Sequence, residues 1–199
     1  MNMQCPRKWV KLRDLARLSF ICVKEKPGVY LVRLIKNGKP LQICRFGNID
    51  RNGIVYIGAT SIRAKRPNLR KRIRDLWRSL EQAYKLRKMG KRWYHTLGIT
   101  LVYSSLINHV DIDDFEIWWK TYDQPVKTKY GKIPEKEYAD MQEKAALLEY
   151  TRRYLEPPPL NLQLGRQYYA IVGIGIVGKS RCNVPLDPDI KNMLFSSDT

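Results

Sequence analysis

The sequence has no hydrophobic run long enough to cross a membrane. Its longest apolar stretch, residues 168–178, falls well short of the roughly 20 residues that a spanning helix needs. Residues 1–18 are charged throughout and lack the apolar core of a signal peptide. We therefore expect a soluble, cytoplasmic protein without a membrane partner.

Cysteine and histidine are also scarce. The four cysteines form no CxxC pair, and the two histidines, His95 and His109, do not stand at zinc-finger spacing from them. This pattern favours free thiols in a reducing compartment over disulfides or a zinc site. We expect both histidines to be structural or surface residues rather than bases. The cysteines are Cys5, Cys22, Cys44 and Cys182.

Acidic residues are too few to balance the basic ones. The chain has 19 Asp and Glu against 37 Lys and Arg, a formal charge of +18. So large a charge destabilises a compact chain by self-repulsion unless an anionic partner offsets it. The densest part, residues 63–92, holds thirteen Lys or Arg against only Asp75 and Glu81. We therefore expect nucleic acid, with DNA as the leading candidate, to be the partner.

The first third of the chain favours short strands joined by tight turns. Trp9, Leu12 and Leu15 lie at helical spacing and predict a short lead-in helix within residues 8–19. Asn37-Gly38 and Asn52-Gly53 are strong turn signals between apolar segments. The pattern predicts an antiparallel meander of three strands, at residues 28–35, 41–46 and 54–58.

The apolar period changes after Pro67. Apolar residues at spacings of three and four predict a helix of roughly twenty residues with a basic outer face. Residues 97–105 are then predicted as a strand. The acidic residues 111–116 are interpreted as the N-terminus of a short helix carrying Trp118 and Trp119, favoured by the helix dipole, rather than as metal ligands. The stripe of the basic helix is Leu69, Ile73, Leu76, Leu80 and Tyr84.

A second long helix is predicted from Pro134, which fits the first helical position, to the prolines that begin at Pro157. Residues 173–180 match the letters of a phosphate-binding loop, GxxxxGK[ST]. Pro185 and Pro188 stand where the helix of such a loop should run, so the match predicts no nucleotide site. The stripe of the second helix is Tyr138, Met141, Ala145, Leu148 and Leu155.

Four separated segments together resemble the GIY-YIG endonuclease family. They are Gly28-Val29-Tyr30, Tyr56-Ile57-Gly58, the basic run Leu69 to Trp77, and the late helix with its proline break, Ala145 to Asn161. Each is weak alone, but all four stand in the family's order across residues 27–161. The resemblance implies an α/β fold of the α+β type, with a small antiparallel sheet flanked by helices.

The resemblance also implies a reaction, the hydrolysis of a DNA phosphodiester with one divalent metal ion, Mg²⁺ or Mn²⁺. Matched segment by segment, Tyr30 and Tyr56 become the active-site tyrosines and Arg72 the catalytic arginine. Glu149 becomes the metal ligand, and Asn161 braces the site. A guanidinium matches phosphate with two hydrogen bonds, and magnesium needs few protein ligands, so one arginine and one carboxylate suffice. A phenol becomes a base only where nearby cations lower its pKa, and either tyrosine could act so.

The chain departs from the family pattern at three points, of which the first is an additional hairpin between the two tripeptides. Extra residues separate Gly58 from the basic run, so Arg66 or Arg70 is an alternative to Arg72. Leu76 stands where many members have a histidine or tyrosine, which removes one candidate base. The remaining basic residues are assigned to DNA binding. That group is Arg66, Arg70, Lys71, Arg74 and Arg78.

We divide the chain into a lead-in helix at residues 1–26, a nuclease core at 27–161 with an insertion at about 106–133, and an extension at 162–199. The insertion and the extension are where we expect substrate specificity. The predicted function is a restriction-like DNA endonuclease, and a homodimer is one way to cut both strands. The alternatives are a structure-specific repair or recombination nuclease, and a nucleic-acid-binding protein without catalysis, whose aromatic residues stack on bases.

Overall fold

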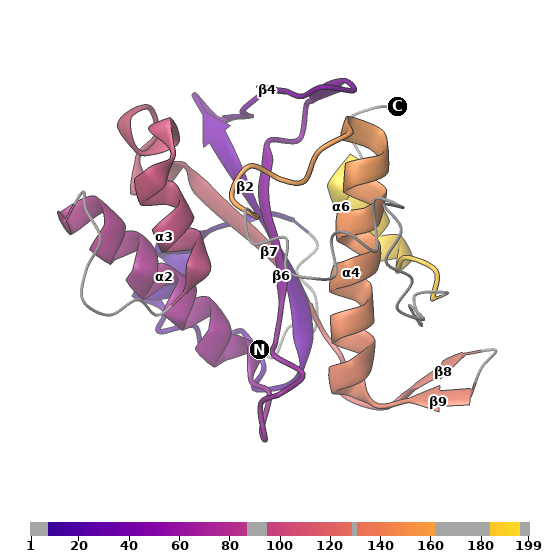
Figure 1. Ribbon diagram of the computed structural model, residues 1–199. Coiled ribbons are helices and arrows are strands. Elements are labelled where there is room, and N and C mark those ends of the chain that lie inside the picture. The colour runs from indigo at the N-terminus through magenta and orange to yellow at the C-terminus, as the bar shows by residue number, and fades with distance from the viewer. Residues whose placement is uncertain (1–7, 87–94, 129–130, 162–183, 196–199) are drawn as a thin grey trace.

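The structure, a computed structural model, describes residues 8–86, 95–128, 131–161 and 184–195. A central antiparallel sheet separates two helical layers (Figure 1). Helices α2 (Leu69–Leu86) and α3 (Thr96–Tyr103) cover one face, and α4 (Glu135–Tyr154) and α6 (Pro188–Phe195) cover the other. The predicted α+β fold with a small antiparallel sheet flanked by helices is confirmed.

Strand β2 (Gly28–Lys36) is the centre of the sheet. It pairs antiparallel with β6 (Ile54–Ala59) on one edge and with β7 (Phe115–Thr121) on the other. Tyr30 therefore lies between Gly58 of β6 and Trp119 of β7. Two short strands, β1 (Val10–Lys11) and β3 (Lys39–Pro40), pair with β7 and with the end of β2. Short helix α1 (Leu12–Arg17) follows β1 and buries Leu12 and Leu15, as the spacing predicted.

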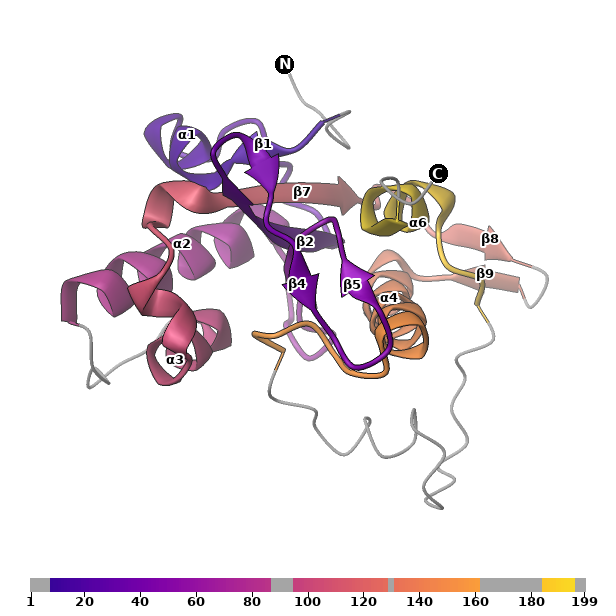
Figure 2. The same cartoon turned by 90° about the horizontal axis from the view of Figure 1, so that it is seen from above.

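The predicted three-stranded meander is wrong in its middle strand. Residues 41–46 do not join the sheet beside β2, because β6 and β7 already occupy both edges of that strand. Instead β4 (Ile43–Cys44) pairs with β5 (Ile49–Asp50) in a separate ribbon. The ribbon lies beside the segment that follows α4 (Figure 2), where the Gly47 amide donates to the Tyr154 carbonyl. The Asn37-Gly38 turn is confirmed, with positive φ at both residues.

Helix α2 is confirmed, but the next predicted strand is a helix. Leu69, Ile73, Leu76 and Leu80 are fully buried in the core between the sheet and α2. Residues 97–105, predicted as a strand, form helix α3 and the start of a 3-10 turn, η1 (Ser105–Asn108). The run "LGITLV" is apolar on all sides and carries no period that separates helix from strand. Gly98 decides the packing, since a Cβ there would lie 2.5 Å from the Ser79 carbonyl oxygen of α2.

The predicted helix carrying the two tryptophans is a strand of the sheet. Trp118 and Trp119 point to opposite faces of β7 and are buried in different cores, as neighbours on a strand must be. The acidic residues before them form a 3-10 turn, η2 (Ile112–Asp114), closed by a capping box between Asp111 and Asp114. Residues 106–133 thus give the sheet one of its central strands. They also include the hairpin of β8 (Val126–Thr128) and β9 (Gly131–Ile133).

Helix α4 exists where the sequence predicts it, but its buried face is rotated. Pro134 is the residue before the helix and not its first residue. Of the predicted stripe only Tyr138 is buried, and Leu155 is 66% exposed. Three tyrosines, two alanines and a glutamine are buried instead. The buried positions are Tyr138, Ala139, Gln142, Ala146, Tyr150 and Tyr154.

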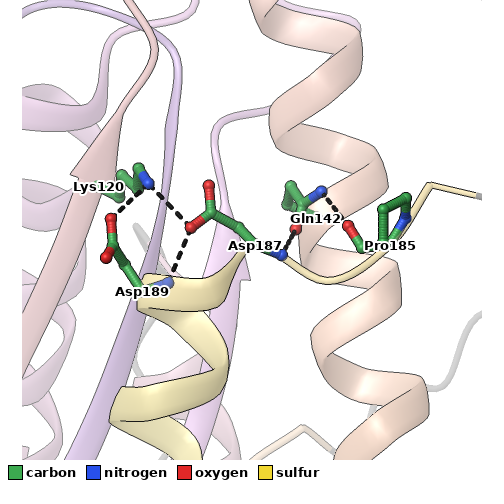
Figure 3. A network of polar contacts seen from close by, with 5 residues as sticks. All are labelled: Lys120, Gln142, Pro185, Asp187 and Asp189. Atoms are coloured by element: carbon green, nitrogen blue, oxygen red, sulfur yellow. Dashed lines mark hydrogen bonds and ion pairs between the residues drawn. The ribbon is translucent and has the colours of Figure 1, made fainter. Parts of the chain in front are cut away.

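The C-terminal helix is held against α4 and the sheet by a polar network (Figure 3). Lys120 of β7 donates to Asp187 at 2.8 Å and to Asp189 at 2.6 Å. The Gln142 side chain of α4 accepts from the Asp187 amide at 2.8 Å and donates to the Pro185 carbonyl at 3.0 Å. Gln142 is fully buried, so both of its polar ends need these partners.

Three further expectations concern the chain as a whole. In the part of the chain that the structure describes, no helix combines the length and the apolarity needed to cross a membrane. Cys22 and Cys44 are free thiols. Cys5, Cys182 and the phosphate-loop match at residues 173–180 lie outside the described residues.

Candidate active site

Two tyrosines from neighbouring strands meet above a glycine. Tyr30 of β2 and Tyr56 of β6 stack with ring centroids 6.0 Å apart, and their side chains are 0% and 6% exposed. Gly58 is the cross-strand partner of Tyr30 and follows Tyr56 on the same face. A Cβ at Gly58 would lie 2.5 Å from the Tyr30 hydroxyl oxygen and 2.7 Å from the Tyr56 ring. The two predicted tyrosines are therefore brought together, and only glycine leaves room for them.

Arg72 reaches this pair from the first turn of α2. The Asn68 side chain caps the helix by accepting from the Lys71 amide at 2.9 Å, which fixes where the helix begins. The Arg72 side chain hydrogen-bonds to Tyr30, and its charge acts on both phenols. Its Nε is buried and has no hydrogen-bond partner among the described residues. A buried N–H of a guanidinium is thus left available beside the tyrosines.

The two alternative arginines lie elsewhere. The Arg70 side chain donates to the Val23 carbonyl at 2.7 Å and pairs with Glu25 at 2.7 Å. Arg66 is exposed in the loop before α2. Of the three candidates, Arg72 is the arginine that the fold places against the phenols.

The acidic residue at this site is Glu143, which lies outside the four sequence segments that resemble the family. Glu143 is partly buried on α4, and its carboxylate accepts a hydrogen bond from the Ala59 backbone at the end of β6. Burial raises its pKa to about 7; the charge of Asp140 adds to the rise, and Arg72 opposes it. The same carboxylate acts electrostatically on Tyr30, Tyr56 and Arg72.

Glu149, the predicted metal ligand, lies on another part of the same helix. Its side chain is 43% exposed and pairs with Arg152 at 3.1 Å. Six residues along an α-helix turn a side chain by about 240° and move it about 9 Å along the axis. The buried face of α4 is rotated from the predicted one, and Glu143, not Glu149, is the glutamate of this helix whose charge acts on the tyrosines. A glutamate flanked by Ala139, Gln142 and Ala146 was the available signal in the sequence.

Asn161 contacts the backbone between the two motif residues of β6. Its side chain accepts from the Ile57 amide and donates to the Ile57 carbonyl, each at 2.8 Å. This pairing replaces a neighbouring strand at the free edge of β6. Leu160 adds a backbone bond from its amide to the Val55 carbonyl. The segment after α4 therefore holds β6 on both sides of Tyr56.

His95 and Thr96 complete the surroundings of the phenols. His95 is 3% exposed, and its Nε2 lies 2.6 Å from the Tyr30 hydroxyl oxygen. Its Nδ1 accepts from the Leu97 amide at 3.0 Å and so caps helix α3. The Thr96 hydroxyl lies 3.2 Å from that of Tyr56. No local pattern predicts these contacts, because they depend on α3 being a helix. His109 is exposed.

The phenols are less acidic here than in water. Burial raises the pKa of Tyr30 well above its ordinary value, and the neighbouring Tyr56 adds to the rise. Burial, followed by the charge of Glu143, raises the pKa of Tyr56. Arg72 acts in the opposite direction on both. A cation bound at Glu143 would remove one contribution that keeps Tyr56 protonated.

The residues present fit a single divalent cation held by one carboxylate. Within the described ranges, no three His, Cys, Asp or Glu side chains gather as a multidentate site. Mg²⁺ does not need such a cluster, since it keeps several waters and takes other ligands from a substrate phosphate. The partly buried Glu143 carboxylate, whose pKa burial has raised, would be stabilised in its charged form by a cation.

The predicted DNA-binding residues lie on and before α2. Arg66, Lys71 and Arg78 are exposed, and Arg74 is partly buried. Arg70 is occupied by Glu25, as described above. The first turn of α2 carries no acidic residue. Its three basic residues stand where the helix dipole favours negative charge and disfavours positive charge. An anionic partner would offset this unfavourable interaction.

Comparison with known proteins gives no match for this chain among family models, curated proteins or solved structures. The likeness to the GIY-YIG family thus rests on the four sequence segments and on what the fold does with their residues.

Proposed function

We propose that the protein is a divalent-metal-dependent endonuclease of the GIY-YIG type that hydrolyses DNA phosphodiester bonds. One observation carries the proposal: Arg72 and Glu143, from helices on opposite faces of the sheet, act on the same pair of buried tyrosines. A structural role alone would not require an arginine, a carboxylate and two phenols at one point. Perturbed titratable groups gathered in this way are typical of catalytic sites.

Arg72 binds the scissile phosphate in this proposal. Its guanidinium offers donors in a fixed fork, and its Nε is buried without a partner among the described residues. Negative charge grows on the phosphate oxygens as a water oxygen attacks phosphorus. Donors already in place stabilise that charge without reorganising, and the contribution of such a group is commonly 10²–10³ in rate, or about 3–4 kcal/mol.

Glu143 would hold Mg²⁺ or Mn²⁺, which supplies charge neutralisation and a more acidic water at the phosphate. A tyrosine that has first lost its proton to solvent accepts, as the phenolate, the proton of the attacking water as the new P–O bond forms and the bond to the leaving oxygen breaks. The leaving oxygen then takes a proton from solvent. Tyr30 and Tyr56 lie side by side above Gly58, so either reaches the same phosphate group.

DNA is the substrate that the charge favours. The formal charge is +18, and exposed basic residues precede and line α2, the helix that carries Arg72. Neutralising backbone phosphates releases counterions, which drives binding irrespective of sequence. We place the protein inside the cell, with its DNA. A restriction-like enzyme is the leading form, and a homodimer would cut both strands.

Two alternatives are kept. A structure-specific repair or recombination nuclease would use the same site on branched DNA. A binding protein without catalysis would use the basic helix alone and would not need Glu143 beside Arg72.

The test is cleavage of supercoiled plasmid by the full chain in Mg²⁺ and in chelator. We expect nicking in Mg²⁺ only. Arg72→Lys keeps the charge and loses the forked donors, so nicking should fall about 100-fold or more while DNA binding persists. Arg70→Lys is the matched control, two residues away on the same helix, and this variant should cut normally. Binding without nicking by the wild type would leave the non-catalytic alternative.

A further inference from the structure

The histidine beside Tyr30 has a tautomer that its partners determine. Nδ1 of His95 accepts a hydrogen bond from the Leu97 backbone amide, which can only donate. Burial, followed by the charge of Arg72, lowers the pKa of His95 well below its usual range, so the ring is neutral. A neutral ring with an accepting Nδ1 carries its proton on Nε2. The 2.6 Å contact to the Tyr30 oxygen is therefore a donation from His95.

The Tyr30 hydroxyl oxygen then receives two donors. One is His95 Nε2–H, and the other is the Arg72 side chain. A hydroxyl has two acceptor positions and one proton, so both of its acceptor positions are filled. The only bond that Tyr30 can still make is with its own proton. The Tyr30 ring stacks on that of Tyr56 with centroids 6.0 Å apart, and hydrogen bonding from Tyr30 lowers the pKa of Tyr56, against the rise that burial causes.

We propose that His95 is a positioning residue, which directs the Tyr30 proton toward the Tyr56 oxygen and so makes Tyr56 the tyrosine whose phenolate accepts the proton of water. The inference rests on the proposed function and assigns different roles to the two tyrosines. Tyr30 donates to Tyr56 and stays protonated, and Tyr56 takes the proton. Thr96 is the second hydrogen-bond partner of Tyr56.

His95 also caps α3, and two substitutions separate its two roles. In His95→Asn, the side-chain oxygen can occupy the place of Nδ1 and keep the cap, but nothing reaches Tyr30. In His95→Gln, the amide nitrogen can occupy the place of Nε2 and donate to Tyr30, but the cap is lost. His109→Gln is the matched control, because the ring of His109 is exposed.

The first measurement needs no activity. Nitrogen NMR of the full chain labelled in its two histidines reports which ring nitrogen carries the proton. We expect the signals of one histidine to report an uncharged ring with its proton on Nε2 at pH 7. These signals should be absent from His95→Asn, which assigns them to His95. A proton on Nδ1, or a charged ring, would overturn the inference even if the protein cuts DNA.

The second measurement is the pH dependence of single-turnover nicking in Mg²⁺. His95→Asn loses one hydrogen bond of the network that stabilises the Tyr56 phenolate. The pH at which the nicking rate rises should therefore increase by about one unit, and below that pH the variant should nick about tenfold more slowly than the wild type. His95→Gln should keep the wild-type profile. The reverse result, with Asn normal and Gln impaired, means that His95 only caps the helix and overturns the inference. A wild type that never nicks removes the proposed function and this inference together, whatever the tautomer.

Discussion

The Tyr30 hydroxyl oxygen lies only 2.5 Å from the position that a Cβ of residue 58 would occupy. The cross-strand pair Tyr30–Gly58 therefore sets the position of the phenol above the sheet. Neither residue can be enlarged or moved without the other, because the ring is fully buried.

Gly58→Ala should displace the Tyr30 ring. We expect a loss of about 1–3 kcal/mol in the free energy of unfolding, as for other overpacked cores, and at least a tenfold loss of nicking. Urea unfolding measures the first effect. In a Tyr30→Leu background the same substitution should lower the free energy of unfolding much less, since the clash between the new Cβ and the Tyr30 ring is absent. An equal cost in both backgrounds would show that the glycine serves some other contact.

Glu143→Gln should stabilise the protein at alkaline pH. The folded pKa of about 7 lies above the ordinary value of 4.5 for a glutamate, so the folded state binds the proton more tightly. The stability that protonation supplies is present below about pH 4.5 and is lost as pH rises to 7. At pH 8 without divalent cations, the glutamine variant should be more stable than the wild type by about 1–3 kcal/mol, and at pH 4.5 the two should be alike.

Glu149→Gln is the matched control for that unfolding experiment, because its carboxylate is exposed. It should change the free energy of unfolding by less than about 0.5 kcal/mol at either pH. A gain at pH 8 that is the same for both variants would contradict the placement of Glu143.

Asn161→Asp should loosen the edge of β6. The new carboxylate cannot donate to the Ile57 carbonyl and repels it, so the variant should lose about 1–3 kcal/mol of stability. Nicking should fall as well, because Ile57 lies between Tyr56 and Gly58. Asn192→Asp, at an exposed position of α6, should change stability by less than about 0.5 kcal/mol. Equal effects of the two substitutions in urea unfolding would refute the bracing role.

Asp187→Ala should release the C-terminal helix from the sheet. The Asp187 side chain is 8% exposed, accepts from Lys120 and from the Asp189 amide, and so closes the start of α6. We expect about 1–3 kcal/mol of destabilisation by thermal or urea unfolding. Asp189→Ala, at a side chain 55% exposed, should cost less than about 1 kcal/mol. The opposite ranking would show that the surface pair holds the helix.

The elements that the sequence predicted well are those with a clear period or turn. An Asn-Gly turn follows strand β2 and another precedes β6, and the stripe of α2 keeps helical spacing from Leu69 to Tyr84. The order of the strands was not predictable in this way, because β7 enters from residue 115 and displaces the middle strand of the expected meander.

The misassigned elements share a different cause. Residues 97–102 carry no charged side chain, and Ile117-Trp118-Trp119 is a short apolar run between Glu116 and Lys120. Short apolar runs of this kind occur in buried helices and buried strands alike. Helix α4 buries alanine, glutamine and tyrosine where the sequence favours leucine and methionine. Because of that rotation, Glu143 rather than Glu149 lies at the site. A stripe chosen by the hydrophobicity of its residues cannot detect such a rotation.

The most direct measurement compares Glu143→Gln with Glu149→Gln in nicking of supercoiled plasmid across a Mg²⁺ titration, with DNA binding measured in parallel. We expect Glu143→Gln to bind DNA normally and to nick at least 100-fold more slowly at every Mg²⁺ concentration. Glu149→Gln should match the wild type. Normal cutting by Glu143→Gln, or loss of cutting by Glu149→Gln alone, would contradict a site in which Glu143, Arg72 and the two tyrosines act on one phosphate.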